Sequence, residues 1–165
     1  MKDSTSVGLG ECAISRNPDD VLVAYGLGSC LGIAMIDPVL RICGLMHAVL
    51  PLPSNGTNSA DGNPYKFVEG GIQAMIDNLA KEGANRNRLV VRIAGGANML
   101  MSSGLSQSFD IGTRNTTTAR AVFQRLRLTV SAEEVGGHTG RTVRVYVADK
   151  RVTVRVVGEK EHDLQ

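Results

Sequence analysis

Short apolar runs bounded by glycine and proline occupy the first third of the chain. They predict three strands, over residues 21–25, 30–36 and 41–50. Gly26 ends the first strand, and Asp37-Pro38 separates the other two. Asp-Pro is a turn signal, because proline fixes φ at the first central position of a turn. The pattern therefore predicts a β-hairpin around residues 37–40.

Apolar residues at three-to-four spacing predict two amphipathic helices farther along the chain. The first covers residues 67–79 and stops near Gly83, after a long loop of Ser, Asn, Gly and Pro at 52–64. The second follows the stretch IGTRN, and Thr113 or Asn115 is the expected N-cap. A loop as long and polar as 52–64 is often functional, so we expect it to border a binding groove.

The C-terminal third alternates polar residues with valine, which is typical of half-buried strands. Antiparallel strands are expected over 128–135, 141–149 and 150–157, with one more strand over 89–94 before the second helix. The polar tail, about 158–165, is expected to be frayed. This order predicts a single domain over residues 1–165 of the α/β (α+β) class, with a mixed or antiparallel sheet.

Composition narrows the function classes. The chain has 42% hydrophobic and 21% charged residues, a net charge of +2 and no charged block, so a nucleic-acid partner is not expected. It lacks the pattern of a signal peptide, and no apolar run reaches the roughly 20 residues of a membrane span. A cytoplasmic protein without membrane insertion is expected. The three cysteines form no C-x-x-C pair, so neither a disulfide framework nor a zinc site is predicted.

Candidate chemistry lies in the hairpin. A turn centred between Pro38 and Val39 would place Cys30 directly opposite His47 on one face, with Cβ atoms about 4.5–5.5 Å apart. An adjacent imidazole can activate a thiol, whose free pKa is about 8.5. The small residues of GLGSC would let the amide N–H groups of Ser29 and Cys30 form an oxyanion hole. A bulge or a wider turn would change this register.

Structural roles remain open for the same residue types. Cysteine is among the most buried residues, and Cys12 and Cys43 are assigned to the core because no histidine or turn is placed to activate them. His138 lies in a glycine-rich turn, GGHTGR, where a solvated histidine is the default. Gly95 and Gly96 are expected to allow a close backbone approach.

Five segments together resemble CheD, the chemoreceptor glutamine deamidase family of bacterial chemotaxis. They are GLGSC (26–30), MHAVLP (46–51), AGGANM (94–99), IGTRN (111–115) and GGHTGR (136–141). The resemblance implies a β-sandwich-like core flanked by helices, similar to the catalytic domain of a cytotoxic necrotizing toxin. It also implies hydrolysis of receptor glutamine side chains to glutamate through a cysteine thioester, without a metal or an organic cofactor.

The family's nucleophile falls on Cys30 and its general base on His47. Some members have a threonine that orients the histidine, and that position is Ala24 here, so the resemblance implies that a backbone carbonyl at Ala24 serves instead. Methyl-accepting chemotaxis receptors are the implied substrates, and the chemotaxis phosphatase CheC is an implied partner. Two alternatives stay open: a weakly catalytic binding module that regulates CheC, and a receptor glutamyl methylesterase.

Overall fold

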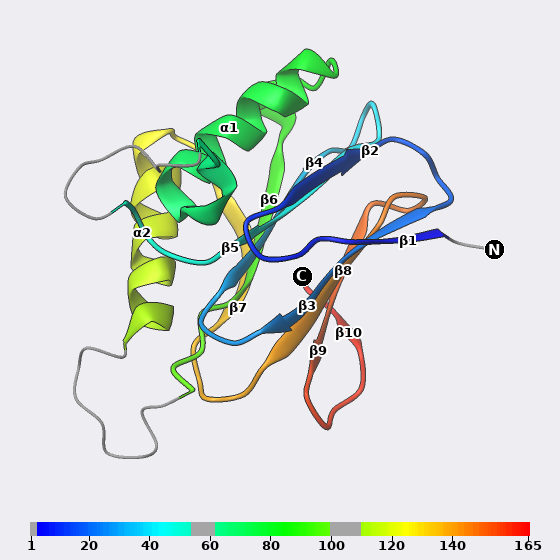
Figure 1. The fold of residues 1–165 in the computed structure, drawn as a ribbon. Coiled ribbons are helices and arrows are strands. Elements are labelled where there is room, and N and C mark those ends of the chain that lie inside the picture. The colour runs from blue at the N-terminus through cyan, green and yellow to red at the C-terminus, as the bar shows by residue number, and fades with distance from the viewer. Residues whose placement is uncertain (1–2, 54–61, 100–109) are drawn as a thin grey trace.

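The computed structural model describes residues 3–53, 62–99 and 110–165, which form two five-stranded sheets and two α-helices (Figure 1). Sheet I consists, in spatial order, of β1 (Asp3–Ser6), β3 (Asp20–Leu27), β8 (Arg141–Tyr146), β9 (Arg151–Val156) and β10 (His162–Asp163). Sheet II consists of β2 (Cys12–Ser15), β5 (Ile42–Ala48), β4 (Leu31–Asp37), β6 (Val90–Gly95) and β7 (Val130–Val135).

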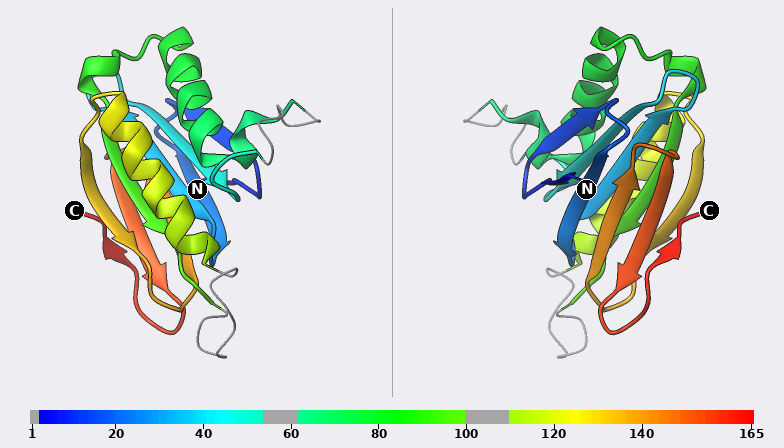
Figure 2. Two further views of the ribbon diagram at one scale, coloured as in Figure 1. Left: turned by 90° about the vertical axis from the view of Figure 1, so that its left-hand side faces the viewer. Right: turned by 90° about the vertical axis from the view of Figure 1, so that its right-hand side faces the viewer.

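Sheet II is the middle layer of the molecule. Its outer face is covered by α1 (Val68–Lys81) and α2 (Ile111–Arg125), and its inner face packs on sheet I (Figures 1 and 2). Two short 3-10 helices, η2 (Pro64–Lys66) and η3 (Arg86–Arg88), flank α1. The predicted α+β class with a sandwich-like core flanked by helices is confirmed; the likeness to the toxin stays a prediction. No helix within the described residues could cross a bilayer.

Alternate residues of β4 and β5 serve two separate apolar cores. The core between the sheets includes Ala34 and Leu45, and the core beneath the helices includes Ile33 and Met46. Both strands are buried along their whole length, which explains why their sequences are continuous apolar runs. Cys30, one residue before β4, belongs to the core between the sheets.

The predicted hairpin is present, but its predicted register is wrong by two residues. Gly32, not Cys30, lies directly opposite His47, and Leu31 pairs with Ala48. The turn is wider than expected, because pairing begins only at Asp37 and Ile42 and leaves residues 38–41 in the loop. A shift of two residues keeps every side chain on its face, so residues 30 and 47 still lie on the same side of sheet II.

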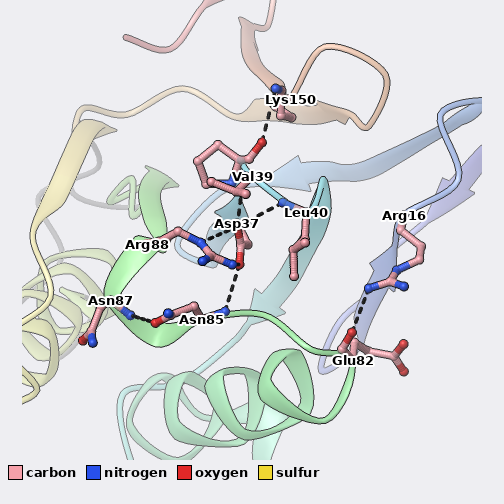
Figure 3. Close-up of polar contacts among 10 residues, drawn as sticks. Arg16, Asp37, Val39, Leu40, Glu82, Asn85, Asn87, Arg88 and Lys150 are labelled. Atoms are coloured by element: carbon pink, nitrogen blue, oxygen red, sulfur yellow. Dashed lines mark hydrogen bonds and ion pairs between the residues drawn. The ribbon is translucent and has the colours of Figure 1, made fainter.

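A buried carboxylate closes this turn (Figure 3). Asp37 accepts hydrogen bonds from the amides of Val39 (3.0 Å), Leu40 (3.3 Å) and Asn85 (2.8 Å) and from the Arg88 guanidinium (3.1 and 2.8 Å). The paired Arg88 guanidinium, helped by these amides, holds the pKa of the Asp37 carboxyl well below its usual range. The side chain thereby ties the hairpin to the segment between α1 and β6.

Three further predictions need correction. The second helix begins at Ile111 after Asp110, so Thr113 and Asn115 lie inside it and neither is the N-cap. β7 is not part of an antiparallel C-terminal sheet, since it pairs in parallel with β6 in sheet II. β3 does not end at Gly26 but continues through a bulge to Leu27.

The C-terminal tail is also more ordered than its polarity predicts. β10 pairs antiparallel with β9, and the Leu164 amide donates to the Val152 carbonyl at 2.9 Å. The Leu164 side chain is only 5% exposed and joins the core between the sheets. Strand pairing and the burial of one apolar residue together hold the charged tail in place.

Candidate active site

The backbone of the cysteine loop is held by the turn that follows β6. The amide of Ala97 donates to the Gly28 carbonyl at 2.8 Å, and the amide of Gly96 donates to the Cys30 carbonyl at 2.9 Å. Gly95 has a φ of +114°, and a Cβ there would lie 2.2 Å from the Cys30 oxygen. The close backbone approach predicted for this glycine pair is confirmed.

The Cys30 side chain is largely enclosed, with an exposed fraction of 9%. Burial raises the pKa of the Cys30 thiol, and the residue's own amide N–H partly offsets this rise. Within the described part of the chain, the loop hydrogen bonds leave the amides of Ser29 and Cys30 without a backbone acceptor. The raised pKa favours the protonated thiol, which needs a base, and in the described residues neither N–H group is bound to a backbone carbonyl with which an anion would compete.

His47 is fixed by both its backbone and its ring. The His47 amide donates to the Glu11 carbonyl at 3.0 Å, and the His47 carbonyl accepts from the Gly10 amide at 2.9 Å. The ring is 2% exposed, and its Nδ1 lies 3.0 Å from the Val7 carbonyl oxygen. A carbonyl can only accept, so Nδ1 carries the hydrogen.

The contact with Val7 leaves the other ring nitrogen, Nε2, to interact with groups other than the backbone. His47 Nε2 is buried and has no hydrogen-bond partner in the described residues. With Nδ1–H donating to Val7, Nε2 of a neutral ring carries the lone pair that can accept a proton. The imidazole therefore has the tautomer required of a general base.

The residue that orients His47 is Val7 rather than Ala24. Ala24 lies in the ladder of sheet I opposite Val143, and its methyl group is buried in the core between the sheets. Val7 follows β1, where the chain crosses from sheet I to sheet II; its amide donates to the Val23 carbonyl at 2.7 Å. Its carbonyl is free of the ladder and reaches the ring across the gap between the sheets.

Cys30 and His47 are diagonal neighbours on the inner face of sheet II. The position opposite Cys30 would be Val49, so His47 lies two residues away along β5. Diagonal neighbours have Cα atoms roughly 7–8 Å apart, within reach of long side chains. Gly32 lies opposite His47 and a Cβ there would be 2.9 Å from a Leu27 methyl, so this methyl forms an apolar wall near the ring.

The helix α2 contributes a buried side chain that the sequence had indicated only as a possible N-cap. Asn115 is 0% exposed, and its Nδ2 donates to the carbonyls of Ser29 (2.9 Å) and Val49 (3.0 Å). The residue stands in the IGTRN segment, which was used to place the start of the helix and the family resemblance but not to predict a contact with the cysteine loop. The sequence could have indicated this buried role, because the residue is polar but lies on the apolar face of the predicted helix.

The other candidates keep structural positions. His138 is exposed in the predicted turn between β7 and β8, with Nδ1 2.9 Å from the Asn98 carbonyl oxygen. Burial raises the pKa of Cys12 to about 12 and that of Cys43 to about 11. Cys43 belongs to the core between the sheets, and Cys12 packs against the core beneath the helices.

A cavity of about 260 Å³ opens beside the histidine strand. Its lining includes Leu9, Gly10, Val49 and Lys66, and the Gly10 amide is the donor to the His47 carbonyl. The 52–64 loop, predicted to border a groove, falls mostly outside the described residues. Among the described residues, no three His, Cys, Asp or Glu side chains are grouped to hold a metal ion.

Comparison with known proteins decides the family. The family model described as "CheD chemotactic sensory transduction" matches residues 49–156, more than half of the chain. A protein of Symbiobacterium thermophilum named "Probable chemoreceptor glutamine deamidase CheD" is 44% identical, over 96% of this chain and 96% of its own length. The chain belongs to the CheD family.

Two more CheD proteins show how broadly the likeness extends. A protein of the same name from Caldanaerobacter subterraneus is 37% identical over 92% of both chains. Another, from the archaeon Pyrococcus abyssi, is 35% identical over 95% of this chain and 94% of its own. The family model begins after His47, but the alignment with the Symbiobacterium protein covers 159 residues of this chain and so includes the cysteine and histidine strands.

Proposed function

We propose that this protein is a chemoreceptor glutamine deamidase, which hydrolyses glutamine side chains of methyl-accepting chemotaxis receptors to glutamate. CheD membership and the names of the relatives support the reaction and the substrate. The arrangement of Cys30 and His47 supports the chemistry. The proposal places the protein in the cytoplasm and includes CheC as a binding partner, following the family resemblance.

The observation that carries the chemical part is the anchored histidine. A ring whose Nδ1–H is held by the Val7 carbonyl keeps the Nε2 lone pair on the face of the sheet that carries Cys30. A purely structural buried histidine would be expected to satisfy both nitrogens, yet Nε2 has no partner among the described residues. An unpaired base near a protonated thiol is the arrangement needed for nucleophilic catalysis.

In the first half of the reaction, His47 Nε2 takes the proton from the Cys30 thiol as Sγ attacks the carboxamide carbon. The amide oxygen becomes an oxyanion, which the N–H groups of Ser29 and Cys30 stabilise. The tetrahedral intermediate then collapses, and the bond between its carbon and the amide nitrogen breaks. The imidazolium of His47 returns its proton to this nitrogen, so that ammonia leaves and a thioester to Cys30 remains.

In the second half, His47 Nε2 takes a proton from water as the water oxygen attacks the thioester carbon. The same two N–H groups stabilise the second oxyanion. Collapse breaks the C–S bond, and the imidazolium protonates the departing thiolate. The products are a glutamate side chain and the original thiol, so each turnover consumes one water and releases one ammonia.

The test is the mass of a receptor cytoplasmic fragment incubated with the protein. Each deamidated glutamine gains about one dalton, and fragmentation of the peptides locates it. We expect the gain with the wild type and its loss with Cys30→Ala, because the nucleophile is removed. Cys12→Ala is the matched control, since that thiol is partly buried in sheet II and packs toward the helices.

Each result has one meaning for the proposal. Deamidation by a folded Cys30→Ala variant would refute the assignment of the nucleophile. No mass gain by the wild type, with the receptor fragment still bound, would replace the enzyme by a binding module. Cleavage of a glutamyl methyl ester without attack on glutamine would point to the methylesterase alternative.

A further inference from the structure

Asn115 joins the two strands of the candidate site at the point where their ladder stops. The last β4–β5 pair is Leu31 with Ala48. Beyond it, β5 turns away, and the amides of Val49 and Leu50 both donate to the Lys66 carbonyl, at 2.9 and 3.1 Å. The side chain of Asn115 spans this opening, with one N–H directed to each side.

The orientation of the Asn115 amide follows from its partners. Both contacts are backbone carbonyls, which only accept, so the NH₂ group must face them. Oδ1 points elsewhere and has no partner in the described residues. A group that accepts but cannot donate would therefore repel both carbonyls. The side chain is fully buried, so it cannot touch a receptor glutamine.

With the hydrogen bond from Asn115, three successive carbonyls of the cysteine loop each accept a hydrogen bond. Backbone amides hold the carbonyls of Gly28 and Cys30, and the side chain of Asn115 holds that of Ser29 between them. With these three carbonyls occupied, the peptide planes on both sides of Cys30 are fixed. The amides of Ser29 and Cys30, which flank the reacting sulfur, are therefore held in one orientation.

We infer that Asn115 is a positioning residue, whose two hydrogen bonds hold the Cys30 loop against the strand end that follows His47. This inference rests on the proposed function, because the geometry it protects is that of the nucleophile, the base and the oxyanion hole. Displacement of a reacting group by about 1 Å can reduce a rate about 10²-fold. The expected effect is therefore on turnover rather than on substrate affinity.

The experiment compares Asn115→Ala, Asn115→Asp and the control Thr117→Ala, an exposed position on the same helix. Deamidation of a receptor fragment gives kcat and KM. We expect Asn115→Ala to lower kcat about 10²-fold and to leave KM within about twofold of the wild type. Asn115→Asp should also be impaired, although it preserves shape, because a carboxylate donates to neither carbonyl and a protonated carboxyl group donates to only one of them. Thr117→Ala should match the wild type.

A second measurement needs no substrate. The rate of Cys30 alkylation by iodoacetamide, resolved from Cys12 and Cys43 by peptide mass mapping, reports the environment of the thiol. We expect its pH profile to change in Asn115→Ala and to remain unchanged in Thr117→Ala. If the alanine variant does not fold, Asn115→Gln carries the test: it keeps the donors, and its kcat must exceed that of Asn115→Asp.

The inference is overturned by wild-type kcat and wild-type Cys30 alkylation in Asn115→Ala. It is equally overturned if Asn115→Asp is as active as the wild type, since shape alone would then suffice. Absence of any mass gain with the wild type would instead overturn the proposed function, and the two failures are thereby distinguishable.

Discussion

Gly95→Ala tests how closely the site depends on the position of the Cys30 backbone. An added Cβ would lie 2.2 Å from the Cys30 oxygen, whereas real Cβ contacts below 3.0 Å are essentially absent. One of the two segments must therefore move by about 0.8 Å. Gly95 pairs with Leu31 at the end of an antiparallel ladder, so the movement displaces the adjoining Cys30, the proposed nucleophile.

The same substitution also strains the backbone. Gly95 has a φ of +114°, and a non-glycine residue at positive φ costs roughly 1–2 kcal/mol. Gly158→Ala is the matched control, because its φ is +86° and nothing lies within 4 Å of its added Cβ. It introduces strain at a positive φ without displacing Cys30. A loss of kcat found only in Gly95→Ala is therefore assigned to the displacement.

We expect Gly158→Ala to lose about 1 kcal/mol of stability and to keep its kcat for deamidation. Gly95→Ala should lose at least as much stability and, in addition, about 10²-fold in kcat, which corresponds to about 2.7 kcal/mol of transition-state stabilisation. Thermal unfolding and receptor-fragment mass spectrometry measure the two quantities, below the melting temperature of both variants. A kcat for Gly95→Ala within about twofold of the control would refute the reasoning.

Two further predictions concern stability away from the site. Asp37→Asn should lower the free energy of unfolding at pH 7 on the order of 2–3 kcal/mol. Because the pKa of Asp37 is depressed in the folded state, the greater free energy of unfolding of the wild type should approach that of the variant as pH falls below about 4. Denaturant titrations that show the same difference in unfolding free energy from pH 7 to pH 2 would contradict this prediction. Leu164→Ala should cost about 2 kcal/mol or more by loss of core packing, whereas Val157→Ala, at an exposed position, should unfold like the wild type.

Local patterns predicted the elements well because their causes are local. The continuous apolar runs of β4 and β5 reflect burial on both faces of the strand, and the three-to-four spacing of α1 reflects burial on one face of the helix. Each pattern can be read from one segment of the sequence alone. The start of α2 was predicted too late because its N-cap, Asp110, precedes the segment that was considered. The Asn115 side chain, which would suit an N-cap, is used instead to bind strand carbonyls.

What the sequence could not show depends on contacts between distant segments. Whether β7 joins sheet I or sheet II is decided by its parallel pairing with β6, and the polar tail is fixed by packing of Leu164 in the core. The histidine anchor is another such case. Val7 and His47 are forty positions apart, and their contact depends on where the chain crosses between the sheets.

The pairing of Cys30 with His47 was inferred from a register that was wrong. The two residues nevertheless lie on the same face of sheet II, because side chains along a strand alternate between its faces with a period of two residues. A turn longer by two residues on its C-terminal side moves the partner by two, which exchanges a direct neighbour for a diagonal one but leaves both side chains between the sheets. A shift of one residue would have sent His47 to the helix side, among Met46 and Ala48. The wider spacing has a chemical consequence. The cysteine lies just beyond the ladder, where its amide has no backbone acceptor among the described residues, while the histidine lies within the ladder, where the Val7 carbonyl holds its ring.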